Sequence, residues 1–258
     1  MGALRRNIPN IITCCNLICG CIATLHAFHH HFGTAFFFIL LGATFDFFDG
    51  FTARLLKVSG PLGVELDSLA DCVTFGVAPS AMIYVLFTEV PYPALIYSQP
   101  WFDYLPFTAF LLAAFSAFRL AKFNIDDRQH TGFLGMPTPA CAIFWGALAT
   151  GCEDFLCSPR FNAPFLLAFM LLFCFLLVSE VPMFALKFKG YGIHNRENLI
   201  RYGFLVFCVA TLIVSGCIAP EGHVWQFLCR GTALCIGVYA ALNIGLSFIP
   251  RREEGSAK

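Results

Sequence analysis

Long apolar segments recur from one end of the chain to the other. A membrane-spanning helix needs about 20 predominantly apolar residues, and eight segments approach or exceed that length. They are residues 11–29, 34–56, 62–88, 106–122, 137–151, 163–186, 200–218 and 227–249. Because lipid offers the backbone no hydrogen-bond partners, segments of this kind fold as helices. We therefore predict an all-α, polytopic membrane protein with eight transmembrane helices.

The composition supports this prediction. Of the 258 residues, 58% are hydrophobic and only 12% are charged, whereas about a quarter of the residues in an average soluble domain are charged. The formal net charge is zero, so no basic field indicates nucleic acid as a partner. The 13 cysteines form no C-x-x-C pair, and we interpret them as small buried hydrophobic residues. No linker divides the chain, so we expect one membrane domain over residues 1–258.

The basic residues predict the orientation in the bilayer. An even number of spans puts both termini on one side of the membrane. If that side is the cytoplasm, 14 of the 16 lysines and arginines lie there or at helix ends facing it, and only Arg160 and Arg230 do not. This distribution follows the positive-inside rule, so both termini are predicted to be cytoplasmic. Four histidines, His26, His29, His30 and His31, fall at the outer end of the first helix, where we interpret them as interface residues rather than metal ligands.

Four aspartates lie in a single predicted helical hairpin, residues 34–88, which turns at residues 59–61. At a rise of 1.5 Å per residue, Asp49 and Asp67 lie about 9–12 Å from the turn, and Asp46 and Asp71 lie about 15–16 Å from it. The two aspartates on each helix are three or four residues apart, so they share a helix face. The hairpin is therefore predicted to gather four carboxylates within the membrane.

A cluster of this kind requires cations. An aspartate near the membrane centre costs about 2.5–3.5 kcal/mol on insertion scales, and neighbouring carboxylates repel one another. Two divalent cations neutralise four negative charges, and oxygen ligands select Mg²⁺, Mn²⁺ or Ca²⁺. Paired cations held by carboxylates are typical of phosphoryl transfer. Gly50, Ala53 and Gly63 leave space beside the acids, and Arg54 is either a phosphate contact or a charge that snorkels to the membrane rim.

The hairpin also carries a recognisable motif. It reads Asp46-x-x-Asp49-Gly50-x-x-Ala53-Arg54, then eight residues, then Gly63-x-x-x-Asp67-x-x-x-Asp71. This pattern resembles the complete signature of the CDP-alcohol phosphatidyltransferase family. The resemblance implies a membrane-embedded helical fold, CDP-diacylglycerol as the donor, CMP as the leaving group and a pair of Mg²⁺ or Mn²⁺ ions. It implies that all four aspartates border the metal site as ligands, that Asp71 is also the catalytic base, and that Gly50, Ala53 and Arg54 contact the CDP portion.

Segments outside the signature indicate the acceptor alcohol. The segments "NIPNIITCCNLICG" (7–20), "LDSLADCVTFGVAPS" (66–80), "FRLAKFN" (118–124) and "GMPTPA" (135–140) resemble those of phosphatidylserine synthases. The resemblance thus implies L-serine as the acceptor, and it also implies a homodimer. The compact form is typical of a bacterial inner-membrane enzyme with its active site facing the cytoplasm. The alternatives are a relative that makes phosphatidylglycerophosphate or an inositol lipid and, more remotely, a cation or proton transporter. Transporters commonly show repeated halves, whereas all four acids here occupy one hairpin.

Several polar residues beyond the motif are candidate substrate contacts. For the serine carboxylate or the lipid phosphate they are Arg119, Lys122, Asn124 and Thr138. Arg119 and Lys122 are also explained as rim charges, and Thr138, between two prolines, as a helix cap. In the first helix, Asn10, Thr13 and Asn16 form a polar stripe. We predict Asn10 and Thr13 as contacts for CDP-diacylglycerol, with hydrogen bonding between helices as the other interpretation of the stripe.

Overall fold

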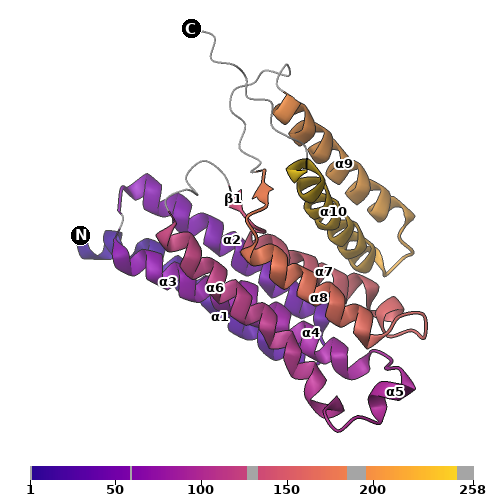
Figure 1. Ribbon diagram of the computed structural model, residues 1–258. Coiled ribbons are helices and arrows are strands. Elements are labelled where there is room, and N and C mark those ends of the chain that lie inside the picture. Colours follow the sequence, from indigo (N-terminus) through magenta and orange to yellow (C-terminus); the bar gives the residue numbers. More distant parts are fainter. Residues whose placement is uncertain (1, 59, 127–132, 185–195, 249–258) are drawn as a thin grey trace.

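The computed structural model describes residues 2–58, 60–126, 133–184 and 196–248. It is built almost wholly from helices (Figure 1). In chain order the elements are α1 (Gly2–Phe28), α2 (Phe32–Leu56), α3 (Pro61–Asp71), the π-helix η1 (Cys72–Val77), α4 (Ala78–Glu89), α5 (Ala94–Tyr97), the 3-10 helix η2 (Phe102–Phe110), α6 (Leu111–Ile125), β1 (Phe133–Leu134), α7 (Thr138–Leu156), α8 (Ala163–Val178), β2 (Pro182–Met183), α9 (Arg196–Ile218) and α10 (Val224–Ser247). The prediction of an all-α, polytopic membrane protein is confirmed.

Six helical segments of the described chain are long and apolar enough to cross a membrane. They are Asn7–Phe28, Phe32–Leu56, Pro61–Glu89, Phe102–Ile125, Asn198–Ile218 and Val224–Ser247. The helix α8, at 16 residues, is apolar but shorter. The remaining predicted span corresponds to α7, so the count of eight spans and the cytoplasmic termini stay predictions.

One predicted helix boundary is wrong. The sixth apolar segment was expected to be helical to residue 186, but α8 ends at Val178 and Ser179 is extended. The next residues are tied to another part of the chain, because β2 pairs antiparallel with β1 and the Val181 carbonyl accepts a hydrogen bond from Gly135 N–H. These backbone bonds outside the helix, with Pro182 lacking an N–H of its own, explain why an apolar sequence leaves the helix here.

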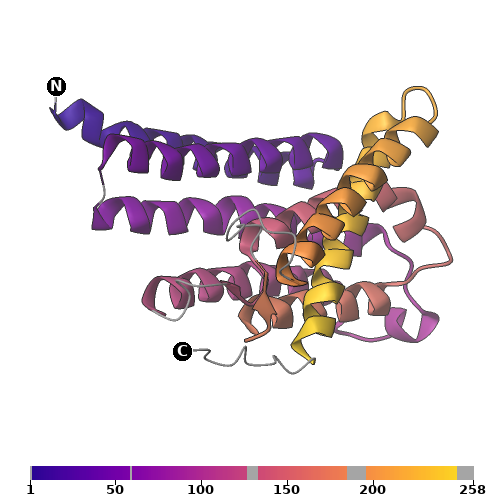
Figure 2. The same ribbon diagram turned by 90° about the horizontal axis from the view of Figure 1, so that it is seen from above.

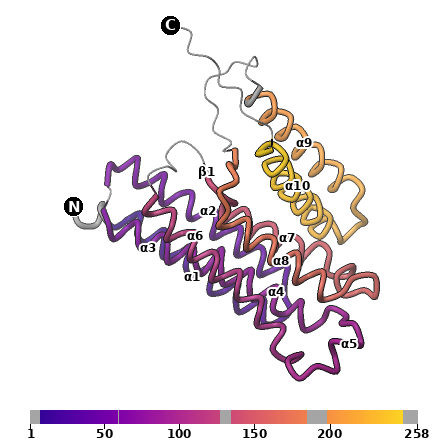
Figure 3. The backbone as a smooth tube through the Cα atoms, viewed as in Figure 1, coloured from indigo at the N-terminus to yellow at the C-terminus, as the bar shows by residue number. Residues whose placement is uncertain are grey.

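The helices α1 and α2 form an antiparallel hairpin along one side of the bundle, and the chain then runs back through α3, η1 and α4 (Figure 2). The tube view shows the beginning of α1, the end of α2 and the start of α3 at the same end of the molecule (Figure 3). The core lies deeper in the bundle around Trp145 of α7, whose ring contacts Phe173 of α8. The pair α9 and α10 packs on α7 through α10.

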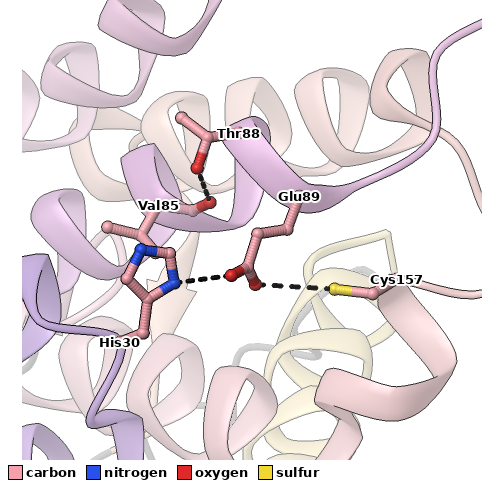
Figure 4. Close-up of polar contacts among 5 residues, drawn as sticks. All are labelled: His30, Val85, Thr88, Glu89 and Cys157. Carbon is pink, nitrogen blue, oxygen red and sulfur yellow. Dashed lines mark hydrogen bonds and ion pairs between the residues drawn. The ribbon is translucent and has the colours of Figure 1, made fainter.

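A polar contact joins the α1–α2 turn to the ends of α4 and α7, and Figure 4 shows its side chains. His30, in the turn between α1 and α2, has its Nδ1 hydrogen-bonded to Glu89 at the end of α4. The other oxygen of Glu89 accepts from the Cys157 thiol, 3.8 Å away, just after α7. His30 is thus explained in part by a bond between helix ends, and the interpretation of the four histidines as interface residues stays a prediction.

Close helix packing behind the aspartate hairpin depends on two glycines. A Cβ atom on Gly20 of α1 would lie 2.4 Å from Thr74 Oγ1, and one on Gly42 of α2 would lie 2.6 Å from Thr74 Cγ2. Thr74 belongs to η1, is fully buried, and donates a hydrogen bond to the Asn16 carbonyl at 3.0 Å. The π-helical turn therefore fits between α1 and α2 only because both glycines lack side chains.

Replacing Gly20 with alanine is expected to destabilise the fold by about 1–3 kcal/mol, the usual cost of overpacking. The change should lower the thermal unfolding temperature of the purified protein in detergent. Gly203→Ala is the matched control, because a Cβ there meets nothing within 4 Å and alanine favours the helix. An unfolding temperature for Gly20→Ala equal to that of the control would contradict the packing described here.

Candidate active site

Three of the predicted aspartates come together between α2 and α3. One carboxylate oxygen from each of Asp46, Asp49 and Asp67 lies within 4.8 Å of the other two. We call these three residues the aspartate triad. Its members face one another because they occupy one face of each helix in an antiparallel hairpin. From the sequence we predicted that the hairpin gathers four carboxylates, and the structure brings three of them within this distance.

Helix α1 forms the third wall of the site through its polar stripe. The Thr13 hydroxyl donates a hydrogen bond to Asp49 Oδ2 at 2.6 Å. One turn along the helix, Asn16 Nδ2 donates to Asp71 Oδ1 at 3.0 Å. Both side chains are buried. Two members of the stripe thus make hydrogen bonds between helices that orient two carboxylates, whereas Asn10 bonds to Asn7 within α1.

Asp71 lies next to the triad but is not one of its three members. It is 7% exposed, and its charge interacts with those of all three triad members. Its Oδ1 is engaged by Asn16. The fourth aspartate therefore borders the triad, and one of its oxygens accepts from a neutral donor on α1.

The donor set of the triad fits a divalent cation. Asp67 Oδ1 is buried and has no hydrogen-bond partner, and within the described residues no lysine or arginine forms an ion pair with the triad. Buried carboxylates without positive partners are strongly disfavoured. Carboxylate oxygens are the ligands of hard cations such as Mg²⁺, Mn²⁺ and Ca²⁺. The triad therefore has the chemistry and spacing to bind a metal ion.

The predicted donor-binding residues lie on the turn side of the triad. A Cβ on Gly50 would meet only Arg54 Nη1, at 4.0 Å, so the backbone borders open space there. Arg54 is exposed, one helical turn further toward the turn of the hairpin. Asn10 Oδ1 lies 3.4 Å from the position of a Cβ on Gly63, and Ala53 is half-buried. The small residues thus leave room for a ligand beside the acids.

Three of the four predicted acceptor-binding residues, Arg119, Lys122 and Asn124, lie on α6, but their side chains have different surroundings. Arg119 is 6% exposed, and its Nε has no hydrogen-bond partner. Its electrostatic neighbours include Asp71 and Cys141. Asn124, at the end of α6, donates to Ser68 Oγ at 2.8 Å, directly beside Asp67 in the chain. Lys122 instead lies 3.9 Å from Glu180 in an ion pair between half-exposed and exposed side chains, so it is already partnered.

The interpretation of Thr138 as a helix cap is wrong. The N-cap of α7 is Pro137, and Thr138 is the first helical residue. Its side chain is 1% exposed, and Oγ1 has no hydrogen-bond partner in the described structure. A threonine at this position has helical backbone angles, so its hydroxyl does not reach the free N–H groups as a cap does.

Sequence reasoning missed several residues near the site. The packing role of Thr74 was not predicted. The glycines that face it, Gly20 and Gly42, could have indicated it, because small residues mark places where helices approach closely. Ser68, the partner of Asn124, had no signal beyond its place in the motif hairpin. Two residues of α10, Tyr239 and Asn243, contact the segment after α8, and nothing in their spacing indicated that role.

Comparison with known proteins supports the motif. The family model described as CDP-alcohol phosphatidyltransferase matches residues 6–189. A Bacillus subtilis protein is 40% identical over 132 residues, which cover 51% of this chain and 69% of that protein. A Saccharomyces cerevisiae protein is 42% identical over 125 residues (45% and 41% of the two chains), and one from Methanocaldococcus jannaschii is 34% identical over 145 residues (55% and 61%). Each of these relatives is named CDP-diacylglycerol–serine O-phosphatidyltransferase.

The matched region contains the whole of the aspartate hairpin and the helix that supports it. It extends from α1 through α8 and ends before α9. It covers well over half of the chain, and the motif residues within it form the acidic site described above. On these grounds the chain belongs to the CDP-alcohol phosphatidyltransferase family.

Proposed function

We propose that the protein transfers the phosphatidyl group of CDP-diacylglycerol to L-serine, giving phosphatidylserine and CMP. The aspartate triad within the family motif carries this proposal. In the reaction, the serine hydroxyl oxygen forms a bond to the phosphorus that carries diacylglycerol. The bond from that phosphorus to the bridging oxygen of CMP breaks, and the serine proton leaves to a base. Serine is favoured as the acceptor because the relatives matched over the motif are named for it.

Asp46, Asp49, Asp67 and Asp71 would hold two divalent cations, Mg²⁺ or Mn²⁺. When bound, such ions stabilise the charge on attacking and leaving oxygens of a phosphoryl transfer. Thr13 and Asn16 orient Asp49 and Asp71 by direct hydrogen bonds, so they maintain the site before substrate arrives.

Asp71 is proposed as the base that accepts the serine proton. A serine hydroxyl is a weak nucleophile at neutral pH, and a positioned carboxylate assists by removing its proton during attack. Because Asn16 engages Asp71 Oδ1, the other carboxylate oxygen is the one available for that proton.

The donor is proposed to bind on the open side of α2. Gly50 and Ala53 allow the CDP portion to approach the helix backbone, and Arg54 contacts a phosphate. Asn10 lies beside the start of α3, facing Gly63, where it would contact the nucleotide together with Thr13. Thr13 already donates to Asp49, so its contribution to the donor is chiefly through that carboxylate.

The acceptor is proposed to bind between α6 and the start of α7. Arg119 Nε and Thr138 Oγ1 are buried polar atoms without partners, and such atoms carry a cost until a ligand satisfies them. The serine carboxylate is a suitable acceptor for an arginine donor. Asn124 and Lys122 lie further along α6 and would contact the ligand at the rim, Lys122 in exchange for its ion pair with Glu180.

The cellular setting is part of the same proposal. The protein is proposed to be a single membrane domain, residues 1–258, that acts as a homodimer in a bacterial inner membrane with the site facing the cytoplasm. The positive-inside distribution supports this orientation.

The proposal is tested by comparing acceptors on one preparation. The purified protein, given CDP-diacylglycerol, should transfer lipid to radiolabelled serine and not to glycerol 3-phosphate or inositol. Transfer to glycerol 3-phosphate or inositol in place of serine would contradict the choice of acceptor while keeping the family reaction.

A further inference from the structure

The helix α10 reaches the catalytic half of the molecule through a short segment after α8. The Tyr239 hydroxyl donates a hydrogen bond to the Phe184 carbonyl at 3.0 Å. Phe184 N–H in turn donates to Asn243 Oδ1 at 2.8 Å. Asn243 Nδ2 donates to the Tyr239 carbonyl at 2.7 Å. Both backbone polar groups of Phe184 are therefore held by α10, a helix that lies beyond the region matched by the family model.

This contact is specific rather than a chance polar encounter. Asn243 is 1% exposed, and a buried amide is tolerated only when its donor and acceptor are satisfied. Tyr239 packs its ring against Phe184, with centroids 5.0 Å apart, and against Phe204 of α9 at 5.8 Å. A single geometry satisfies the amide, the hydroxyl and the rings together. We call Tyr239 and Asn243 the α10 strap.

The strap is linked to the start of α7 by backbone bonds. Phe184 directly follows β2, which pairs with β1. Beyond β1, Gly135 N–H donates to the Val181 carbonyl and Met136 N–H to the Leu176 carbonyl, each at 2.9 Å. Gly135 has φ of +75°, and a Cβ there would lie 2.7 Å from the Leu177 carbonyl. The chain leading to Thr138 is thus held by two backbone hydrogen bonds and packs closely on the end of α8.

The two unpartnered polar groups proposed for the acceptor lie near the strap. Thr138 begins α7, and Cys141, one turn later on the same helix, is an electrostatic neighbour of Arg119. Tyr239 is also among the neighbours of Arg119. Through β2 and β1 the strap is therefore connected to the backbone that leads to Thr138, one of the two groups that would hold a small acceptor.

We propose that Tyr239 and Asn243 are positioning residues for the acceptor subsite. They act through β2, β1 and Gly135 on Thr138, and they leave the donor side untouched because that side is built from α1, α2 and α3. The inference rests on the proposed function, in that it takes the space beside Arg119 and Thr138 as the acceptor subsite. It assigns the pair α9 and α10 a part in acceptor selection.

The test compares substitutions in α10 on the full-length protein. Asn243→Leu removes both hydrogen bonds of the amide, Tyr239→Phe removes only the hydroxyl, and Thr232→Val is the matched control. Thr232 bonds within α10, to the Leu228 carbonyl, and does not reach β2. The KM for serine, kcat, and the affinity for CDP-diacylglycerol without serine are measured on each, together with the thermal unfolding temperature.

Asn243→Leu should raise the KM for serine at least about tenfold, on the scale that follows from small misplacement of a binding group. Tyr239→Phe should raise it less, because the ring packing remains. Donor affinity should stay within about twofold of the wild type in both, and Thr232→Val should change neither quantity. If Asn243→Leu does not fold, Tyr239→Phe alone decides, since it removes a single hydroxyl.

An unchanged KM for serine in a folded strap variant would overturn the inference. A parallel loss of serine and donor affinity would also overturn it, because that pattern indicates general destabilisation. Failure of the proposed function gives a different result: the wild type would then use another alcohol, and the strap would be tested by the KM for that alcohol.

Discussion

Removal of divalent cations is expected to abolish phosphatidyl transfer completely. The triad places three carboxylate oxygens within 4.8 Å of one another with no ion-paired lysine or arginine among the described residues. Like charges at this spacing repel, and catalysis of phosphoryl transfer depends on charge neutralisation at the reacting oxygens. EDTA should therefore eliminate turnover, and Mg²⁺ or Mn²⁺ should restore it.

A readout independent of activity separates metal binding from catalysis. Addition of Mg²⁺ or Mn²⁺ to the metal-free protein should raise its unfolding temperature, because a ligand that binds only the folded state stabilises it. The rise should be lost in Asp67→Asn and retained in Asp103→Asn, whose carboxylate is exposed and distant in the chain. Full activity in a demonstrably metal-free preparation would rule out the metal-dependent account.

Asp71→Asn is expected to lower kcat by about 100-fold or more, the usual scale for loss of a general base. Asparagine preserves the shape of the side chain and an oxygen that accepts from Asn16, so the buried contact between α1 and α3 is retained. Only the basicity is removed. Affinity for CDP-diacylglycerol, measured separately, should fall much less than kcat.

Two other results for Asp71→Asn would assign the residue differently. Turnover close to that of the wild type would show that another group accepts the proton. A collapse of donor binding together with turnover would identify Asp71 chiefly as a metal ligand. Asp71 is not among the three carboxylates that lie within 4.8 Å of one another, so Asp67→Asn and Asp71→Asn test different parts of the site.

Much of the site was accessible from sequence because it depends on helical periodicity. The rise per residue and the i, i+3 and i, i+4 spacings fixed the relative depth of Asp46, Asp49 and Asp67 once the hairpin was recognised. The apolar length of each segment likewise predicted the helices. These properties are local, so a single sequence carries them.

The remaining features depend on contacts between distant segments. The π-helix at Cys72–Val77 and its fit against Gly20 arise from how α1 and α3 meet, and no periodicity encodes it. The end of α8 at Val178 follows from the pairing of the next segment, β2, with β1, about 45 residues earlier in the chain. Nothing in the sequence around Tyr239 and Asn243 indicates that they bind Phe184, because that contact joins segments more than 50 residues apart.

The most direct test of the central claim measures CMP and phosphatidylserine, the two products, in the same reaction mixture. The purified protein is supplied with CDP-diacylglycerol labelled in the cytidine and with serine carrying a second label, in the presence of Mn²⁺. The account predicts equal amounts of CMP and serine-labelled lipid at every time point in the wild type and in Asp103→Asn, and neither product in Asp67→Asn. Release of CMP without labelled lipid, or undiminished transfer to serine by Asp67→Asn, would contradict it.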